Sequence, residues 1–252
     1  MGDTAGRKGL GTRLHIIVLR ECGEPQVMHT DFEQMVHLAH QVSTSGRWEA
    51  LNEKVRTLAQ TPGRRPPWWI QVTGGLLSKV FTEYLSLKRS FDDMGEPSLL
   101  AWRARNLLEL SIWSHYCSKT EEHAHRLYED AGRDEIGIYE EFSKWGTVTS
   151  KDQDFLDLFS EASKNLEQRA MKEGVSSLQG KFKEVADAAK ELGMGHHYKV
   201  TNRMLSKFAH PTALSILSVA SQKTEQEQRE LFFAFGCLFF VGAFTIIELQ
   251  LR

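Results

Sequence analysis

The chain has 252 residues, a formal net charge of −2 and 41% hydrophobic residues, which is the composition of an ordinary soluble globular protein. The near-neutral charge argues against a protein that works by non-specific attraction to nucleic-acid phosphates, while leaving room for local basic stripes. Three widely separated cysteines, Cys22, Cys117 and Cys237, exclude a zinc knuckle or a small disulfide scaffold and favour a reducing, cytoplasmic location.

Residues 1–26 are predicted to form a short irregular N-terminal tail. The first eleven residues are rich in glycine and lack the apolar stretch and small-residue cleavage site of a secretory signal. Leu14–Leu19 can form a short strand, but Gly23 and Pro25 end it, and no second β-rich run follows for it to pair with. A β-sheet core is therefore not expected.

From Asp31 onward, apolar residues recur every three or four positions, which is the spacing of amphipathic helices. The first two groups are Phe32, Met35, Val36 and Ala39, and then Trp48, Leu51, Val55 and Leu58. These groups can form a small helical cap, residues 27–60. A linker over residues 61–69 follows, because its prolines remove backbone donors and restrict the residues before them.

Further helical patterns predict the main part of the fold. They cover residues 74–93, 98–119, 121–143, 152–172, 180–192, 196–209, 212–220 and 226–250. Breaks are expected at Gly95-Glu96-Pro97, Gly146, Gly174, Gly193-Met194-Gly195 and His210-Pro211. Eight or more helices with short connections predict an all-α multi-helix bundle, with one main domain over residues 27–252.

The C-terminal run from Leu231 to Ile247 has no formal charge over seventeen residues, which is the lower edge of what spans a bilayer. No marked excess of cations on one side orients it in a membrane. A bundle of this size also needs a central helix that is apolar all round. A buried core helix is therefore favoured, with Gly236 and Gly242 permitting close helix approach, and a membrane anchor is the alternative.

The predicted helix 98–119 carries the first candidate site residues. Arg105 and Glu109 are four residues apart and fall in one narrow stripe with Ile112 and Tyr116. The helix is apolar on both of its other faces, so these two charges are expected inside the bundle, where charges need partners. Either an ion pair that fixes helix register or a functional site would explain them.

The predicted helix 196–209 carries the second group. One half of its wheel holds Tyr198, Lys199, Asn202, Arg203, Ser206 and His210, and the other holds Val200, Met204 and Phe208. Pro211 forces the backbone out of the helix at His210, and the negative end of the helix dipole there suits a proton donor. We expect Arg105 and Glu109 to face Tyr198, Ser206 and His210 across a helix pair. Helix capping by His210 is the alternative without chemistry.

These residues resemble an uncharacterised family of bacterial all-helical proteins. The resemblance rests on Arg105-Asn106-Leu107-Leu108-Glu109, followed by Tyr198, Ser206, Phe208-Ala209 and His210-Pro211. It spans residues 75–220. It implies a helical fold and supplies no activity.

A second resemblance is looser. Arg203 and His210, with six residues between them, are similar to the motif of HEPN-type helical ribonucleases, in which an Arg and a His converge at a dimer interface to cleave RNA without a metal. In that family a polar residue usually follows the Arg, whereas Met204 follows here. The chemistry is coherent, because a cation can stabilise the pentavalent phosphate while an imidazole moves the proton of the attacking 2′-hydroxyl.

Two interpretations of the site follow. In the first, the protein is a metal-independent RNA- or nucleotide-directed hydrolase of phage defence or stress, acting as a monomer or homodimer without a cofactor. His210 is then the general acid and base, Arg203 and Arg105 stabilise the anion, Glu109 orients one of them, and Tyr198 and Ser206 complete the site. In the second, the cluster is structural and the bundle works by binding another protein. Membrane anchoring through residues 231–247 is a third hypothesis.

The sequence lacks the motifs of several other enzyme classes. The chain has no Gly-x-Ser-x-Gly elbow, no Walker loop and no Gly-rich strand-to-helix turn. Residues Glu122 to His125 contain one Glu-x-x-His, but a di-iron bundle needs a second copy, so a solvated helix start is expected there instead of a metal site.

Overall fold

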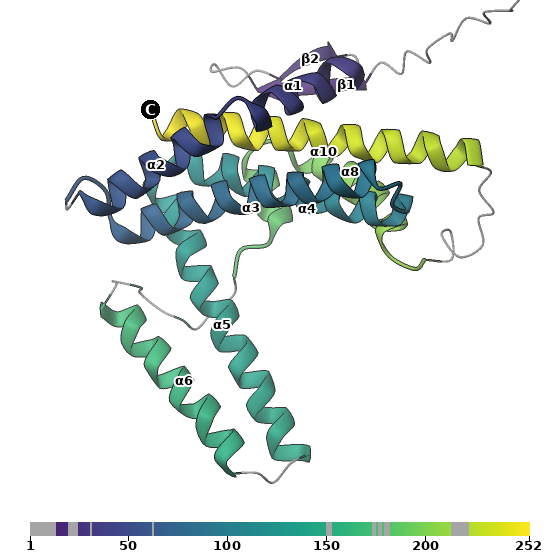
Figure 1. Ribbon diagram of the computed structural model, residues 1–252. Coiled ribbons are helices and arrows are strands. Elements are labelled where there is room, and N and C mark those ends of the chain that lie inside the picture. The colour runs from purple at the N-terminus through teal and green to yellow at the C-terminus, as the bar shows by residue number, and fades with distance from the viewer. Residues whose placement is uncertain are drawn as a thin grey trace, which may run out of the picture.

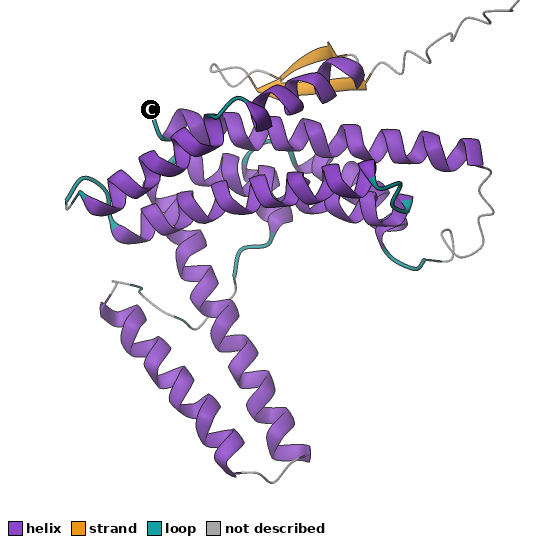
Figure 2. Ribbon diagram, in the orientation of Figure 1, coloured by secondary structure: helices purple, strands orange, loops and turns teal. Residues whose placement is uncertain are grey.

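The computed structural model describes residues 14–19, 25–30, 32–61, 63–149, 153–172, 175, 178, 182–212 and 222–252. This part of the chain is a helical bundle with one β-hairpin, so the predicted all-α class is confirmed (Figures 1 and 2). The elements are β1 (Leu14–Leu19), β2 (Pro25–Thr30), α1 (Phe32–Thr44), α2 (Arg47–Gln60), α3 (Pro67–Asp92), α4 (Pro97–Lys119), α5 (Glu121–Thr149), α6 (Gln153–Lys172), α7 (Val185–Glu191), α8 (Gly195–Ala209) and α10 (Gln222–Gln250).

Strands β1 and β2 form an antiparallel pair, with Leu14 opposite Thr30 and Leu19 opposite Pro25. The strand at Leu14–Leu19 is confirmed, and the expectation that it has no partner is wrong. The signal of β2 was weak because it begins with proline and contains several polar residues. In a two-stranded sheet both strands are edges, and an edge tolerates a proline.

Helices α3, α5 and α10 are longer than the sequence predicted, and α10 begins at Gln222 instead of residue 226. Helix α3 begins at Pro67 instead of residue 74, because proline is tolerated at the first helical position, where its missing N–H would have no acceptor within the helix. Helix α5 continues through the expected break at Gly146 as far as Thr149. A single glycine inside a helix costs only about 1 kcal/mol, which neighbouring contacts can outweigh.

The other predicted boundaries vary in outcome. Breaks at residues 95–97, 193–195 and 210–211 are confirmed, and Gly193 has a left-handed φ of 74°. Helix α7 covers only residues 185–191 of the predicted 180–192. Gly174 and residues 213–220 of the predicted helix 212–220 lie outside the described residues.

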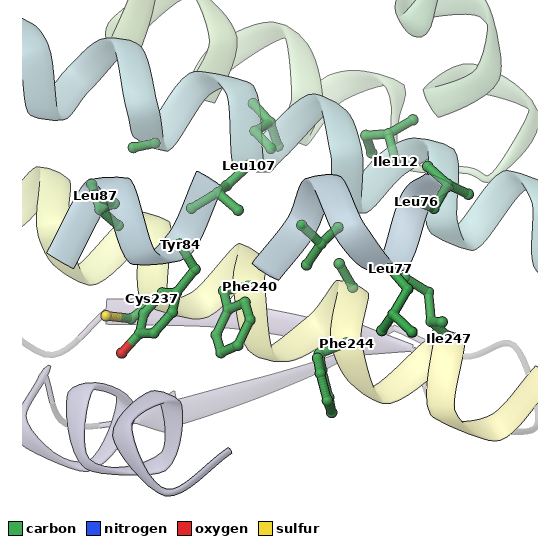
Figure 3. Packing of buried hydrophobic residues seen from close by; sticks show 14 of the residues in the cluster. Leu76, Leu77, Tyr84, Leu87, Leu107, Ile112, Cys237, Phe240, Phe244 and Ile247 are labelled. Atoms are coloured by element: carbon green, nitrogen blue, oxygen red, sulfur yellow. The ribbon is translucent and has the colours of Figure 1, made fainter. Parts of the chain in front are cut away.

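The core lies where α3, α4 and α10 pack together, with α1 against α10 and α8 against α4. Figure 3 shows side chains of the three central helices meeting in this core. Its aromatic rings stack closely, with centroids 3.9 Å apart for Tyr84 and Phe240 and 4.1 Å apart for Phe91 and Phe233. The apolar periodicity of three separate segments is thus satisfied by one shared interior.

Helix α10 is long and apolar enough to cross a membrane, and half of its most apolar window is buried inside the protein. A Cβ on Gly236 would lie 2.2 Å from Cδ2 of Leu87, so the predicted close helix approach is confirmed there. At Gly242 the nearest atom, Oγ of Ser111, would be 3.7 Å away, which is an ordinary contact. Of these two glycines of α10, only Gly236 is therefore required by packing with a neighbouring helix.

Buried Arg229 connects α10 to the end of α3. Its guanidinium donates hydrogen bonds to the carbonyl oxygen of Phe91, at 2.7 Å, and to that of Gly95. The last carbonyls of a helix have no partner within the helix, and a cation at that end also matches the helix dipole. Arg229 thus caps α3 and holds the start of the apolar helix in place.

The outer half of α5 and the whole of α6 project away from the bundle as a helical hairpin (Figure 1). We call this hairpin, residues 134–149 and 153–172, the arm. Phe159 of α6 packs between two side chains of α5, with ring centroids 5.2 Å from Phe142 and 6.0 Å from Tyr139. The arm thus has a small apolar seam of its own.

Candidate functional site

Arg105 is the centre of a polar cluster between α4 and α8, which we call the Arg105 cluster. Its Nε donates a hydrogen bond to Oδ1 of Asn202 at 2.9 Å, and its Nη2 forms an ion pair with Oε1 of Glu109 at 2.9 Å. Its Nη1 lies 3.4 Å from Nε2 of His210. Ser206 donates a hydrogen bond to the same oxygen of Asn202 at 3.4 Å. Each nitrogen of the guanidinium therefore has a partner, and the expected contact between Arg105 and the later helix is present.

Local sequence explains how the two helices present these groups. Arg105 and Glu109 are four residues apart on α4, so their side chains lie on the same face. Asn202 and Ser206 have the same spacing on α8. His210 adopts an extended conformation, with φ −117° and ψ 152°, because the proline after it disfavours helical geometry. The backbone thus leaves the axis of α8 at His210, and the imidazole of this residue lies beside the Arg105 guanidinium.

The cluster is more open than the sequence predicted. The side chains of Arg105 and Glu109 are 26% and 28% exposed, and His210 is exposed. The expectation that both charges lie inside the bundle is therefore wrong, because α4 presents this stripe to the edge of its contact with α8. Arg105 and Glu109 also line a cavity of about 860 Å³ that the start of α7 and helices α3, α5, α6 and α8 help to enclose.

Tyr198 is buried beside the cluster and lines the same cavity. Burial raises the pKa of its hydroxyl, the negative charge of Glu109 raises this pKa further, and the positive charge of Arg105 opposes both effects. Tyr198 therefore remains a neutral hydroxyl group at physiological pH, able to donate or accept a hydrogen bond.

Arg203 is not part of the Arg105 cluster. It is exposed on the outer face of α8, in one row with exposed Lys199 and Lys207 at spacings of four residues. Within the part of the chain that the structure describes, none of these three cations forms an ion pair. Val200, predicted on the apolar half of α8, is 56% exposed beside this row. The outer face of α8 is thus a basic stripe that leads towards His210.

Sequence reasoning missed a second polar group at the junction of α4, α5 and α7. His123 lies 2.8 Å from a carboxylate oxygen of Glu191, and Lys183 donates a hydrogen bond to the other oxygen at 2.6 Å. The Lys183 ammonium lies 5.0 Å from the centre of the Tyr116 ring. Hydrogen bonds from Lys183 and His123 keep the pKa of Glu191 below its ordinary value, although some burial opposes them.

The expectation of a solvated helix start is thus wrong for His123. The imidazole also lies 2.6 Å from the hydroxyl of Thr120, which accepts a bond from the His123 backbone N–H. No periodic signal links Lys183 or Glu191 to α5, so only the tertiary structure brings this group together. Among the described residues, no group of three or more His, Cys, Asp or Glu side chains is arranged to hold a metal ion.

Three charged residues are buried on α5 close to the arm. Arg133 donates hydrogen bonds to Asp130 at 2.6 Å and to Glu129 at 3.0 Å, and Asp130 also accepts the backbone N–H of Lys183 at 3.0 Å. The spacings of three and four residues are a signal that sequence analysis can use. This group fixes the segment before α7 against α5, and therefore shapes the wall of the cavity.

A family model, the family of unknown function DUF5677, matches residues 74–228 of the chain. The chain belongs to this family. The predicted resemblance to an uncharacterised family of all-helical proteins is confirmed, and the resemblance to HEPN-type ribonucleases receives no support. No curated protein and no solved structure matches the chain significantly.

The region shared with the DUF5677 family contains the whole Arg105 cluster and the arm. Most of the central apolar helix, α10, lies beyond residue 228 and outside the match, as do α1 and α2. The matched segment thus carries the polar sites, while much of the surface that covers α3 and α4 comes from outside it.

Proposed function

We propose that the Arg105 cluster is the active site of a metal-independent enzyme that cleaves RNA. The observation that carries this proposal is the contact between the Arg105 guanidinium and the exposed His210 imidazole, whose nitrogens lie 3.4 Å apart. A fixed cation and an imidazole side by side are the two groups that phosphodiester cleavage by a 2′-hydroxyl needs.

In the proposed reaction, His210 accepts the proton of a ribose 2′-hydroxyl, whose oxygen attacks the adjacent phosphorus. The bond from phosphorus to the 5′ oxygen breaks, and the imidazolium returns the proton to that departing oxygen. The products are a 2′,3′-cyclic phosphate and a 5′-hydroxyl. Arg105 stabilises the extra negative charge of the pentavalent phosphate, while Asn202 and Glu109 hold its guanidinium in place.

The basic stripe of α8 supports a nucleic-acid substrate. Lys199, Arg203 and Lys207 are exposed cations that lead towards His210, so they can attract the phosphates next to the scissile bond. This gives Arg203 a binding role outside the cluster, whereas the catalytic cation of a single chain is Arg105. Three phosphate contacts would make the logarithm of the RNA affinity fall with the logarithm of salt concentration at a slope of about −2.

The test compares cleavage of a labelled single-stranded RNA by the full-length wild-type protein, His210→Ala and His197→Ala in EDTA. His197 is an exposed imidazole on the same helix but outside the cluster, which makes it the matched control. We expect cyclic-phosphate products from wild type and His197→Ala, and a loss of at least about 100-fold in His210→Ala. Thermal melting of each variant shows whether folding is matched. Absence of cleavage by wild type, or equal rates in all three proteins, overturns the proposal.

One observation favours the non-enzymatic alternative, in which the cluster fixes α8 against α4. Every guanidinium nitrogen of Arg105 already has a protein partner, as in a satisfied structural network. Under this alternative, Arg105→Ala lowers the free energy of unfolding by about 1–3 kcal/mol without any effect on RNA binding or cleavage. A filter-binding assay with the same RNA separates the two outcomes.

Membrane anchoring through residues 231–247 stays a prediction, supported by the length and composition of α10. Pelleting of the protein with membranes after carbonate washing tests it. The cytoplasmic location, the homodimer and the role in phage defence or stress also stay predictions.

A further inference from the structure

Trp102 is an exposed tryptophan on α4, one helical turn before Arg105. The residue is 37% exposed, and the spacing of three residues makes its side chain a neighbour of Arg105 on the helix surface. Tryptophan is highly buried on average in globular proteins. An indole that stays open to solvent beside the Arg105 cluster is therefore a candidate for contact with a substrate.

Helices α4 and α8 run antiparallel at the Arg105 cluster. Tyr198, near the start of α8, lines the same cavity as Glu109. One turn further along α8, Asn202 accepts a hydrogen bond from Arg105, which lies one turn earlier on α4. The next turn back along α4, at Trp102, is therefore level with the end of α8, where the chain leaves the helix beside the Arg105 guanidinium.

An ion pair between α3 and α4 holds the indole of Trp102 in one orientation. The Arg103 guanidinium lies over the ring, 4.7 Å from its centre, which is a cation–π contact. Arg103 in turn donates hydrogen bonds from Nη1 to both carboxylate oxygens of Glu83, at 3.1 and 3.2 Å. The side chains of Arg103 and Glu83 are only 25% and 16% exposed, so most of this pair is shielded from solvent. The ring is thus held from one side, while part of the residue stays open.

We propose that Trp102 is the stacking surface for an unpaired RNA base next to the scissile phosphate, so that the enzyme acts on single-stranded RNA. This inference rests on the proposed cleavage of RNA at the Arg105 cluster. The base stacks on the indole where Arg103 leaves it open, while the phosphate of the same nucleotide reaches Arg105 and His210. Every base has a π face, so this contact positions the strand without selecting a sequence.

The two helices supply the two contacts that a single strand needs. The Arg105 cluster lies between α4 and α8, so Trp102 borders it on one helix and the basic stripe borders it on the other. A strand whose phosphates follow the stripe can place one unpaired base on the indole. In a duplex each base is paired and stacked between its neighbours, and it must be flipped out to reach a side chain. Duplex RNA is therefore the poorer substrate.

The test uses a strand of 2′-O-methyl RNA with a single free 2′-hydroxyl, so that only one phosphodiester can be cleaved. This intact strand is compared with two abasic strands, which lack the base on the 5′ or the 3′ side of that bond, and with its duplex. Values of kcat/KM are measured in EDTA for the full-length wild type, Trp102→Leu, Trp102→Phe and Trp145→Leu. Trp145 is the matched control, a tryptophan of the arm that is 57% exposed. Thermal melting shows whether folding is matched.

We expect Trp102→Leu to lower kcat/KM for the intact strand at least about fivefold, and Trp102→Phe and Trp145→Leu to change it by less than about twofold. With wild type, one abasic strand and the duplex should each be cleaved at least about fivefold more slowly. Removal of the same base should cost Trp102→Leu less than about twofold, because the variant has no stacking contact to lose.

A purely structural role of Trp102 predicts a different result, in which removal of the base costs Trp102→Leu as much as it costs wild type. That result overturns this inference and leaves the proposed RNA cleavage standing. Equal cleavage of the intact and both abasic strands by wild type does the same, whatever the stability of the Trp102 variants. Absence of cleavage of the intact strand by wild type overturns the proposed function, and this inference with it.

Discussion

The central helices and the arm differ in how completely their apolar side chains are buried. In the centre, Phe240 is fully buried and stacks on Tyr84, and Gly236 lets α10 approach Leu87 without a side chain between them. In the arm, Phe142 stacks on Phe159 yet is 45% exposed. Both regions are built from helices with apolar faces, but the large apolar side chains that are fully buried lie in the centre, where more helices pack against one another.

A covered apolar face and an open one contribute differently to the stability of the protein and to its binding of other molecules. A face covered on all sides lowers the free energy of the folded state and is unavailable to other molecules. A face left open in the folded chain contributes little to its stability, but it can bind a partner. We therefore expect substitutions in the centre to unfold the protein and matched substitutions in the arm to leave it folded.

The largest contrast is expected from a pair of phenylalanine truncations. Phe240→Ala should lower the free energy of unfolding by about 3–5 kcal/mol, because it leaves a cavity among fully buried side chains. Phe142→Ala should cost about 1 kcal/mol or less, since much of its ring already meets solvent. Urea denaturation monitored by circular dichroism measures both. Equal costs would mean that the arm is as tightly packed as the centre.

A second contrast compares two glycines of the same helix. Gly236→Ala places a Cβ 2.2 Å from Cδ2 of the fully buried Leu87, so the Leu87 side chain or α10 must shift, at a cost of about 1–3 kcal/mol. Gly242→Ala meets its nearest atom at 3.7 Å and should be neutral or stabilising by up to about 1 kcal/mol, because alanine favours helix. The midpoint of urea unfolding reports the sign of each effect. A stable Gly236→Ala protein would contradict the close approach of α3 and α10.

The smallest contrast concerns ion pairs and pH. Hydrogen bonds from Arg47, and the charges of Arg47 and Arg252, hold the pKa of Glu248 below its ordinary value of 4.5, although some burial opposes them. Because the folded state has the lower pKa, the stabilisation is complete above pH 4.5 and is lost as the pH falls through the lowered value. Arg47→Gln should therefore cost about 0.5–1 kcal/mol at neutral pH and progressively less in acid.

The matched arm pair is Glu135 and Arg169, whose side chains are 41% and 60% exposed. Arg169→Gln should change the free energy of unfolding by less than about 0.5 kcal/mol, because solvent screens an exposed pair. Denaturation curves of both variants at neutral pH and below pH 4 measure the difference. A larger cost for Arg169→Gln would show that charges hold the arm together more strongly than its apolar seam does.

Much of the fold was accessible from sequence because helical periodicity is local. The spacing of apolar residues located the segments that became α4, α6 and α8 to within a residue or two at each end. The boundaries of α3 and α5 were wrong where the local rule is weak, at a proline that can start a helix and at a glycine that neighbouring contacts can hold in one. Strand β2 was missed because its pattern is mostly polar.

Only part of the candidate site could be predicted from the sequence. The i,i+4 spacing predicted that Arg105 and Glu109 share a face, and Pro211 predicted the exit of His210 from its helix. The same pattern did not show that Asn202 holds the Arg105 guanidinium, nor that Arg203 points away from it. Lys183 and Glu191 carry no periodic link to His123, so their network with it had no sequence signal.

The sequence by itself determined that this protein is a helical bundle, which faces of its helices are apolar, and where α8 ends at His210, because these properties follow from residues within a few turns of one another. The tertiary structure alone decided which helix covers which face. It placed Arg105 at an open edge beside His210 instead of in a sealed interior, and it left Ile138 and Phe142 of α5 54% and 45% exposed. Periodicity records that a face is apolar, but the partner of that face depends on contacts between residues far apart in the chain.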